Sequence, residues 1–271
     1  MTVGQAFGKV LGMHTKLYPS DMTDSHWNLI KEMIPVAKTG GRPRNTDMRM
    51  VVNAIFYLVT SGIQWRMLPR EYPNWKTVYH YFWMWRNDGI WQRIHDTLRA
   101  RTREKEGRHK HPTAGSMDSQ SVKCSFMPGR RGYDAGKKIN GRKRHALVDT
   151  IGLLFGLVIT EASTSDPAGA RLLLSRLSGS CKCLRKIWVD GTYRGQLLDW
   201  VAQRFRFHLE AVMQPKGQKG FSILPRRWVV ERTFAWLGLY RRLSKDYEVS
   251  IASSAAMIYI AMTRLMLKRL A

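Results

Sequence analysis

Cysteine is scarce in this chain of 271 residues, which has three, Cys124, Cys181 and Cys183. Three cysteines do not make a disulfide framework, and Cys181-x-Cys183 lacks both the spacing and the second pair of a zinc site. Long apolar runs are also missing, since the nearest, Ile251 to Thr263, is shorter than the roughly 18 residues of a membrane span. The N-terminus lacks the charged-then-apolar pattern of a signal peptide. We therefore expect a cytoplasmic protein without a membrane partner.

Acidic residues are few as well. Asp and Glu number 20 against 45 Lys and Arg, which gives a formal net charge of +25. Charge of one sign repels itself unless a polyanion shares its field, so nucleic acid is the first partner to consider. A hydrophobic fraction of 44% and ten tryptophans exclude a disordered basic tail. The length suits one large domain or two small ones.

The first hundred residues predict helices, each marked by a cap residue or a break in the apolar pattern. Residues 1–16 carry no clear pattern and are expected to be disordered. The predicted helices begin after Thr23, after Thr46 or Asp47, and after Asn74, and a fourth runs from Ile90 to about Arg103.

The third of these helices is basic and aromatic, which is typical of a helix-turn-helix arrangement. Lys76, Thr77 and His80 lie near its start, where a recognition helix presents side chains to DNA bases. The alternative is a small helical bundle in which every Trp and Tyr is core. We predict a helical DNA-binding domain at 1–104, followed by a charged linker at 105–113.

From Ala114 onward, short apolar runs separated by turns replace the helical pattern, and helices then alternate with strands. This order predicts an α/β domain at 114–271, a mixed sheet with flanking helices. The expected strands end at Asp118, cover 146–148 and 153–160, end at Asp190 and cover 207–213, and the expected helices cover 166–177, 195–204, 226–242 and 251–270.

Three acids stand out in this second region. Asp118 and Asp190 each follow a short apolar strand, and functional groups gather at the carboxyl ends of neighbouring strands. Glu231 is the single acid on a helix face with Arg227, Ala235, Gly238, Arg242 and Lys245. Together the three would form an all-oxygen site suited to Mg²⁺ or Mn²⁺, with two ions about 4 Å apart at a phosphodiester. Taken singly, each Asp reads as a turn or cap residue, and Glu231 as a surface pair with Arg227.

The stretch from Gly129 to His145 contains seven Lys or Arg residues among several glycines. Glycines let backbone amides approach phosphate, and the charge releases counterions on binding. We expect a loop that contacts double-stranded DNA without reading its sequence, although a generic basic loop is the alternative. The predicted phosphate contacts are Lys137, Lys138, Arg142, Lys143 and Arg144.

Several motifs taken together resemble the DDE transposases of bacterial insertion sequences, in particular the insertion-sequence-five-like group. The resemblance covers about residues 17 to 268. It rests on the segments 117–123, 136–145, 148–152, 189–193 and 227–237, with Trp65-Arg66-x-Leu68-Pro69 and Trp75-x-x-Val78-Tyr79 in the N-terminal region.

The resemblance implies a ribonuclease-H-like catalytic domain with Asp118, Asp190 and Glu231 as the catalytic and metal-binding triad. It also implies Mg²⁺-dependent nicking at the terminal inverted repeats of a mobile element, and attack of the exposed 3′-hydroxyl on target DNA. The resemblance further implies a homodimer that pairs two DNA ends, and a cytoplasmic protein associated with the bacterial nucleoid. The other possibilities are a transposase-derived DNA-binding protein without catalysis, and a metal-dependent nuclease without strand transfer.

The sequence departs from the related signature Tyr-x-x-Arg-x-x-x-Glu-x-x-x-x-x-x-Lys. Arg227 and Glu231 match it, but Leu224 stands at the Tyr position and Gly238 at the Lys position. DNA-end contacts by that Tyr and Lys therefore do not transfer to this chain. Arg242 or Lys245 is expected to supply the missing charge from the same helix face.

Overall fold

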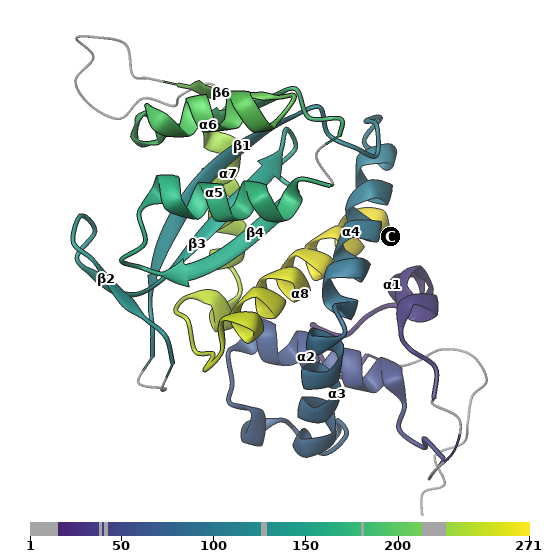
Figure 1. Ribbon diagram of the computed structural model, residues 1–271. Helices are drawn as coiled ribbons and strands as arrows, with labels where there is room; N and C mark the ends of the chain where they lie inside the picture. Colours follow the sequence, from purple (N-terminus) through teal and green to yellow (C-terminus); the bar gives the residue numbers. More distant parts are fainter. Residues whose placement is uncertain (1–15, 38–39, 41–42, 126–128, 180–181, 213–225) are drawn as a thin grey trace, which may run out of the picture.

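The computed structural model of the protein describes residues 16–37, 40, 43–125, 129–179, 182–212 and 226–271 (Figure 1). The disorder expected at 1–15, the signature position Leu224, Cys181 and the end of the expected strand at Met213 lie outside these ranges.

Four helices form the N-terminal region, as the cap residues predict. Thr23 accepts a hydrogen bond from the His26 amide at 3.1 Å, Asp47 from the Arg49 amide at 2.8 Å and Asn74 from the Lys76 amide at 3.0 Å. Each bond satisfies a backbone donor that the first helical turn leaves free. The helices are α1 (Asp24–Ile30), α2 (Met48–Ser61), α3 (Trp75–Asn87) and α4 (Ile90–Lys105), with 3-10 turns η1 (Lys31–Met33) and η2 (Trp65–Met67).

The second region contains a mixed sheet, which confirms the predicted α/β class. Its order is β2-β3-β1-β5-β6, and β4 also pairs with β3. β3 is antiparallel to β1 and β4, whereas β5 runs parallel to β1 and β6 parallel to β5. The strands are β1 (Ala114–Lys123), β2 (Gly132–Asp134), β3 (Ile139–Asp149), β4 (Leu154–Glu161), β5 (Lys186–Val189) and β6 (His208–Ala211).

Two predictions about these strands are wrong. The first strand does not end at Asp118, because β1 continues to Lys123 and its second half pairs with the start of β3, Asp118 opposite Ala146 and Lys123 opposite Gly141. The basic stretch 129–145 is not a loop either, since β2 and the first half of β3 occupy most of it. The glycines favour turns, but the backbone hydrogen bonds between β1 and β3 keep this part of the chain extended.

Helices cover both faces of the sheet (Figure 1). Leu147 on β3 packs in one apolar cluster with α5 (Asp166–Leu177) and α6 (Gln196–Arg204). Its neighbours Ala146 and Val148 point to the opposite face, toward α7 (Trp228–Gly238) and α8 (Ile251–Leu270). Because successive side chains of a strand point to opposite faces, β3 contributes to the apolar cluster on each side of the sheet. Two further 3-10 turns, η3 (Gly191–Tyr193) and η4 (Arg241–Leu243), follow β5 and α7.

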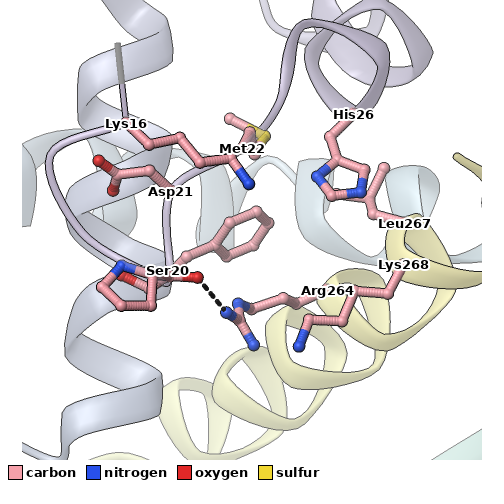
Figure 2. A pocket seen from close by; sticks show the side chains of 10 residues that line it. Lys16, Ser20, Asp21, Met22, His26, Arg264, Leu267 and Lys268 are labelled. Carbon is pink, nitrogen blue, oxygen red and sulfur yellow. Dashed lines mark hydrogen bonds between the residues drawn. The ribbon is translucent and has the colours of Figure 1, made fainter.

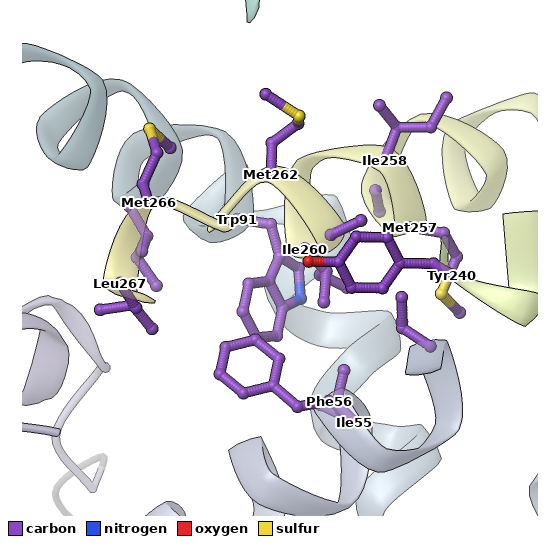
Figure 3. Close-up of a cluster of buried hydrophobic side chains, with 14 of the residues drawn as sticks. Ile55, Phe56, Trp91, Tyr240, Met257, Ile258, Ile260, Met262, Met266 and Leu267 are labelled. Atoms are coloured by element: carbon purple, nitrogen blue, oxygen red, sulfur yellow. The ribbon is translucent and has the colours of Figure 1, made fainter. Parts of the chain in front are cut away.

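The N-terminal helices share a hydrophobic core with α8. Ile55 and Phe56 of α2 and Trp91 of α4 lie in one buried cluster with Met257 and Ile260 of α8 (Figure 3). A single core therefore continues across the segment 105–113 that the sequence marks as a linker. Among the described helices, α8 is long and apolar enough to cross a membrane by length and composition, but 61% of its most apolar window is buried within the protein.

Candidate active site

Asp118 lies in the middle of β1 with its carboxylate largely buried, 17% exposed. One carboxylate oxygen accepts a hydrogen bond from the backbone amide of Ser119 at 2.7 Å. Burial, helped by the negative charge of Asp190, raises the pKa of Asp118 to about 6. The Ser119 amide and the Arg227 guanidinium act in the opposite direction. A partly desolvated carboxylate beside a second acid favours an added cation or a proton.

Asp190 comes directly after β5 and is brought beside Asp118 by the parallel pairing of β5 with β1. The pairing ends with Ser116 opposite Trp188, and Asp190, two residues further on, is close enough for its charge to raise the pKa of Asp118. Asp190 also begins the 3-10 turn η3, where its Oδ1 accepts hydrogen bonds from the amide of Thr192 at 2.8 Å and from the Thr192 hydroxyl. Asp190 therefore caps a turn, as one prediction had it, and also lies near Asp118.

Glu231 stands in the first turn of α7 with half of its side chain exposed. The predicted pair with Arg227 is present, with Arg227 Nη2 3.4 Å from Glu231 Oε1. The same nitrogen lies 3.4 Å from Asp118 Oδ2. One guanidinium thus joins an acid of the sheet to an acid of the helix 113 positions later in the chain, a contact that a routine helix-surface pair would not make.

Hydrogen bonds hold α7 against the sheet at both sides of Glu231. The Ser116 hydroxyl donates to the carbonyl of Arg226 at 2.7 Å, just before the helix. Further along, the Thr233 hydroxyl donates to Gly152 O at 2.8 Å and Arg232 donates to Ile151 O at 3.0 Å. The sequence reasoning missed these positioning residues. In the sequence, the feature that could have identified them is a polar residue on the otherwise apolar side of a strand or helix.

The donor set suits a hard divalent cation, since it consists of carboxylate oxygens around a desolvated Asp118. Within the described ranges, no three His, Cys, Asp or Glu side chains already stand together as a metal shell. Arg227 lies between Asp118 and Glu231 and supplies the local positive charge.

The helix face around Glu231 is open, as predicted. Ala235 and Gly238 are exposed, and a side chain added at Gly238 would meet nothing within 4 Å. The opposite side of α7 is buried through Val230, Phe234 and Leu237. A large polyanion therefore has room to approach the acids along this face.

Some predicted DNA contacts are on the surface. Lys137 and Lys138 are exposed in the turn between β2 and β3, and Lys137 Nζ lies 3.5 Å from the carbonyl of Ser119, next to Asp118. Lys76 and His80 are exposed on the first turns of α3, and Thr77 is half-buried there.

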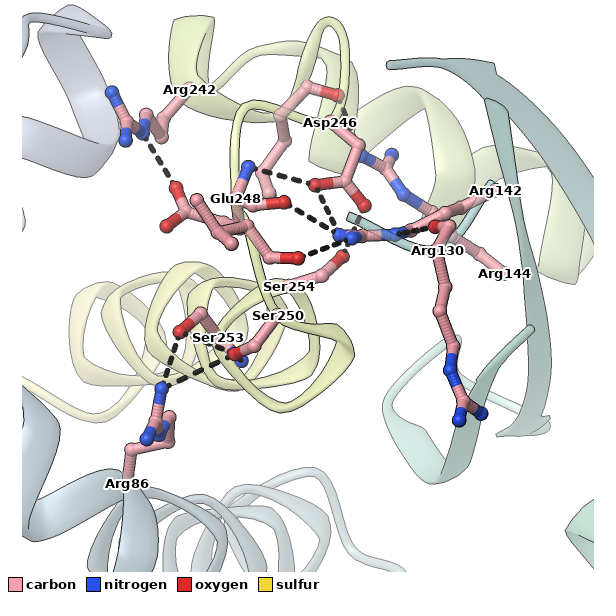
Figure 4. Close-up of polar contacts among 12 residues, drawn as sticks. Arg86, Arg130, Arg142, Arg144, Arg242, Asp246, Glu248, Ser250, Ser253 and Ser254 are labelled. Atoms are coloured by element: carbon pink, nitrogen blue, oxygen red, sulfur yellow. Dashed lines mark hydrogen bonds and ion pairs between the residues drawn. The ribbon is translucent and has the colours of Figure 1, made fainter. Parts of the chain in front are cut away.

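Three other predicted phosphate contacts are wrong, because Arg142, Lys143 and Arg144 are buried within β3. Arg142 pairs with Asp246 at 3.1 Å (Figure 4), and Lys143 pairs with Asp166 at 3.1 Å and Asp134 at 3.4 Å. Arg144 donates to the carbonyl of Leu243 at 2.9 Å, and burial lowers its pKa to about 10. These side chains hold the protein together instead of facing a ligand. The pairing with β1 and β4 places them in the sheet interior.

The expected role of Arg242 is also wrong. α7 ends at Gly238, so Arg242 lies in η4 and leaves the Glu231 face. Its buried guanidinium pairs with Glu248 at 2.8 Å and donates to the carbonyl of Ile63 at 2.9 Å. Lys245 is exposed, but it too follows η4 and does not extend the face of α7.

Two family models match this chain. The family model described as a transposase DDE domain matches residues 109–266, and one described as a putative transposase of the IS4/5 family matches residues 22–95. An uncharacterized protein, y4sN, of Sinorhizobium fredii is 26% identical over 69 residues, 26% of this chain and 55% of that protein. The chain therefore spans about half the length of this curated relative. None of the solved structures matches the chain.

Proposed function

Because the chain belongs to the DDE transposases of the IS4/5 type, we propose that Asp118, Asp190 and Glu231 are its catalytic and metal-binding triad. A DDE domain implies a ribonuclease-H-like fold, and the mixed sheet with helices on both faces agrees with it. DDE transposases are DNA-acting enzymes that generally depend on divalent metal. The observation that carries the proposal is the single guanidinium of Arg227 joining Asp118 to Glu231, with Asp190 close enough to raise the pKa of Asp118.

The three carboxylates would hold one or two Mg²⁺ or Mn²⁺ ions. When bound, such ions activate a water or a 3′-hydroxyl and stabilise the leaving oxygen of a phosphodiester. Asp118 and Asp190 provide oxygens from the rigid sheet, and Glu231 provides them from a helix fixed by Ser116 and Thr233. Arg227 neutralises Asp118 and Glu231 before the substrate binds and then contacts a DNA phosphate.

The substrate would be the terminal inverted repeats of an insertion sequence, which the enzyme nicks before joining the 3′-hydroxyl to target DNA. Support comes from the net charge of +25 and from exposed lysines 137 and 138 beside Asp118. The exposed Lys245 would contribute a further phosphate contact. Two DNA ends need two active sites, so a homodimer in the DNA complex, acting at the bacterial nucleoid, follows from this reaction.

Sequence choice would come from α3, acting as the second helix of a helix-turn-helix unit. Its exposed side carries Lys76, Tyr79, His80 and Trp83, at spacings of three and four residues. Two large aromatic side chains on this side oppose the alternative in which all of them are core. Basic and aromatic side chains on one helix face suit phosphate contact and base readout. On this basis residues 1–104 would bind the repeats and residues 114–271 would cut them.

Single substitutions of the triad test the proposal. We expect Asp118→Asn, Asp190→Asn and Glu231→Gln each to lower the nicking rate of end-containing DNA in Mg²⁺ more than about a hundredfold, because each removes a charged oxygen ligand. Asp199→Asn, at an exposed position on α6, is the matched control and should keep full activity. A triad variant that nicks at the wild-type rate would refute the assignment.

Product analysis separates the remaining possibilities. Joined donor–target molecules in the same reaction identify a transposase, whereas nicked DNA without joined products identifies a nuclease. A wild-type protein that binds the repeats but leaves them uncut in Mg²⁺ and Mn²⁺ would be a DNA-binding protein only.

A further inference from the structure

A small pocket lies between the segment before α1 and the last turns of α8 (Figure 2). Its volume is about 50 Å³. The apolar side chains of Met22, Phe56 and Leu267 form much of its wall, and three basic side chains also line it. The polar lining residues are Lys16, Ser20, Asp21, His26, Arg264 and Lys268.

Three cations converge on this pocket from two separate segments. Figure 2 shows Lys16 on the N-terminal side of the pocket and Arg264 and Lys268 on α8, all three as lining residues. The negative C-terminal end of α8 accounts for Lys268, which lies in the last turn, but not for Arg264 or Lys16. Arg264 lowers the pKa of Lys268, with burial adding to the effect, as expected for cations held together without a neutralising anion.

The acid in the pocket wall does not neutralise them. Asp21 Oδ2 accepts hydrogen bonds from the amides of Leu17 and Tyr18, each at 3.1 Å. Its Oδ1 accepts one from the Tyr72 hydroxyl at 2.6 Å. Among the residues that the structure describes, Lys16, Arg264 and Lys268 form no ion pair with a carboxylate.

Ser20 provides a second and independent sign of a ligand. The residue is 7% exposed, and its hydroxyl lies near that of Tyr72 but forms no hydrogen bond of normal geometry within the described part of the chain. A buried hydroxyl without a partner is costly, so such groups usually meet a ligand or a water. Arg264 donates from one nitrogen to the carbonyl of Pro19 at 3.3 Å and also reaches the Tyr240 hydroxyl, so part of its five N–H groups remains for a ligand.

The pocket is large enough for a few water-sized groups and too small for a nucleobase. We propose that it binds a phosphate oxyanion, with Ser20, Arg264 and Lys268 as direct donors and Lys16 closing the open side. The phosphate would come either from the backbone of bound DNA or from free phosphate in solution. The site is independent of the proposed triad.

Titration of the full-length protein with inorganic phosphate, followed by calorimetry at constant ionic strength, tests the proposal. We expect saturable binding that Ser20→Ala and Lys268→Gln each weaken about tenfold, the effect of losing one hydrogen bond to a charged ligand. Ser20→Ala keeps every charge and removes only the unpartnered hydroxyl. Arg93→Gln, at an exposed position of α4, removes one positive charge elsewhere and should leave phosphate affinity unchanged.

Absence of saturable phosphate binding would overturn the proposal, as would equal affinity in wild type, Ser20→Ala and Lys268→Gln. Non-specific duplex binding at several salt concentrations then identifies the source. If DNA occupies the pocket, Lys268→Gln lowers the slope of log affinity against log salt by about 0.9 more than Arg93→Gln does. If only free phosphate binds, the two slopes agree. Neither binding measurement depends on DNA nicking. A negative result for the pocket therefore leaves the proposed triad untouched, and a negative result for the triad leaves the pocket untouched.

Discussion

The buried ion pair between Arg103 and Asp149 connects the N-terminal helices to the helix that carries Glu231. Arg103 extends from α4, and its Nη1 lies 2.5 Å from Asp149 Oδ2, with the two side chains 5% and 0% exposed. Asp149 Oδ1 also accepts hydrogen bonds from the amides of Ile151 at 3.0 Å and Leu153 at 2.8 Å. Asp149 therefore organises the β3–β4 turn to which α7 is attached.

We predict that Asp149→Asn lowers the free energy of unfolding by about 3 kcal/mol. The amide oxygen can still accept both backbone hydrogen bonds, so the loss comes from leaving the Arg103 charge buried without a counterion, and breaking such a pair typically costs about 3–5 kcal/mol. With a urea slope of about 3 kcal/mol/M, the unfolding midpoint should fall by about 1 M. Equilibrium unfolding in urea measures this shift.

The pair between Lys186 and Glu210 is the matched control. Its two atoms are as close, at 2.6 Å, but the side chains are 33% and 46% exposed. Glu210→Gln should therefore cost less than about 1 kcal/mol, because water screens an exposed pair. If Asp149→Asn and Glu210→Gln shift the midpoint equally, burial does not set the strength of the Arg103 pair and the reasoning is refuted.

Three further predictions concern pH and DNA affinity. The pKa of His145 is lowered to about 4, chiefly by burial, so the unfolded chain binds more protons than the folded protein between about pH 4 and 6.5. His145 therefore makes stability fall as pH falls through that window, and His145→Gln should flatten the fall in urea midpoints measured from pH 6.5 to 4. Asp118 has the opposite sign, because its pKa is raised to about 6: without metal, stability should fall as pH rises from about 4 to 6, and this component should be missing in Asp118→Asn. Gly238→Lys restores the basic residue of related transposases on an open face, and we expect unchanged stability and a salt slope of DNA binding steeper by about 0.9, measured against Ala235→Gln. An unchanged slope would show that DNA does not follow this face.

Local interactions fixed much of what could be predicted. The caps Thr23, Asp47 and Asn74 lie where the sequence placed them, because each bonds to an amide two or three residues away. The final helix has the predicted bounds, Ile251–Leu270, since its apolar run has a serine cap before it and no breaker within it. The candidate acids Asp118, Asp190 and Glu231 were chosen from their places after apolar runs and on a basic helix face, and the motif resemblance agreed with that choice.

The interior of the sheet was less predictable, because a basic run looks the same whether it faces DNA or a buried acid. Arg142 meets Asp246 and Lys143 meets Asp166, partners that are distant in the sequence and close only after β3 pairs with β1. The end of α7 at Gly238 similarly removed Arg242 from the Glu231 face.

The sequence alone thus determined the family, the order of helices and strands, and the candidate metal-binding acids, since these depend on residue type and local spacing. Only the tertiary structure decided which charges remain at the surface and which acids Arg227 contacts. Arg227 shows the difference. Its pair with Glu231 follows from helical spacing. Its contact with Asp118 requires the start of α7 to lie against β1, where Ser116 donates a hydrogen bond to the carbonyl of Arg226. Long-range pairing depends on the packing of segments far apart in the chain, and no local pattern encodes it.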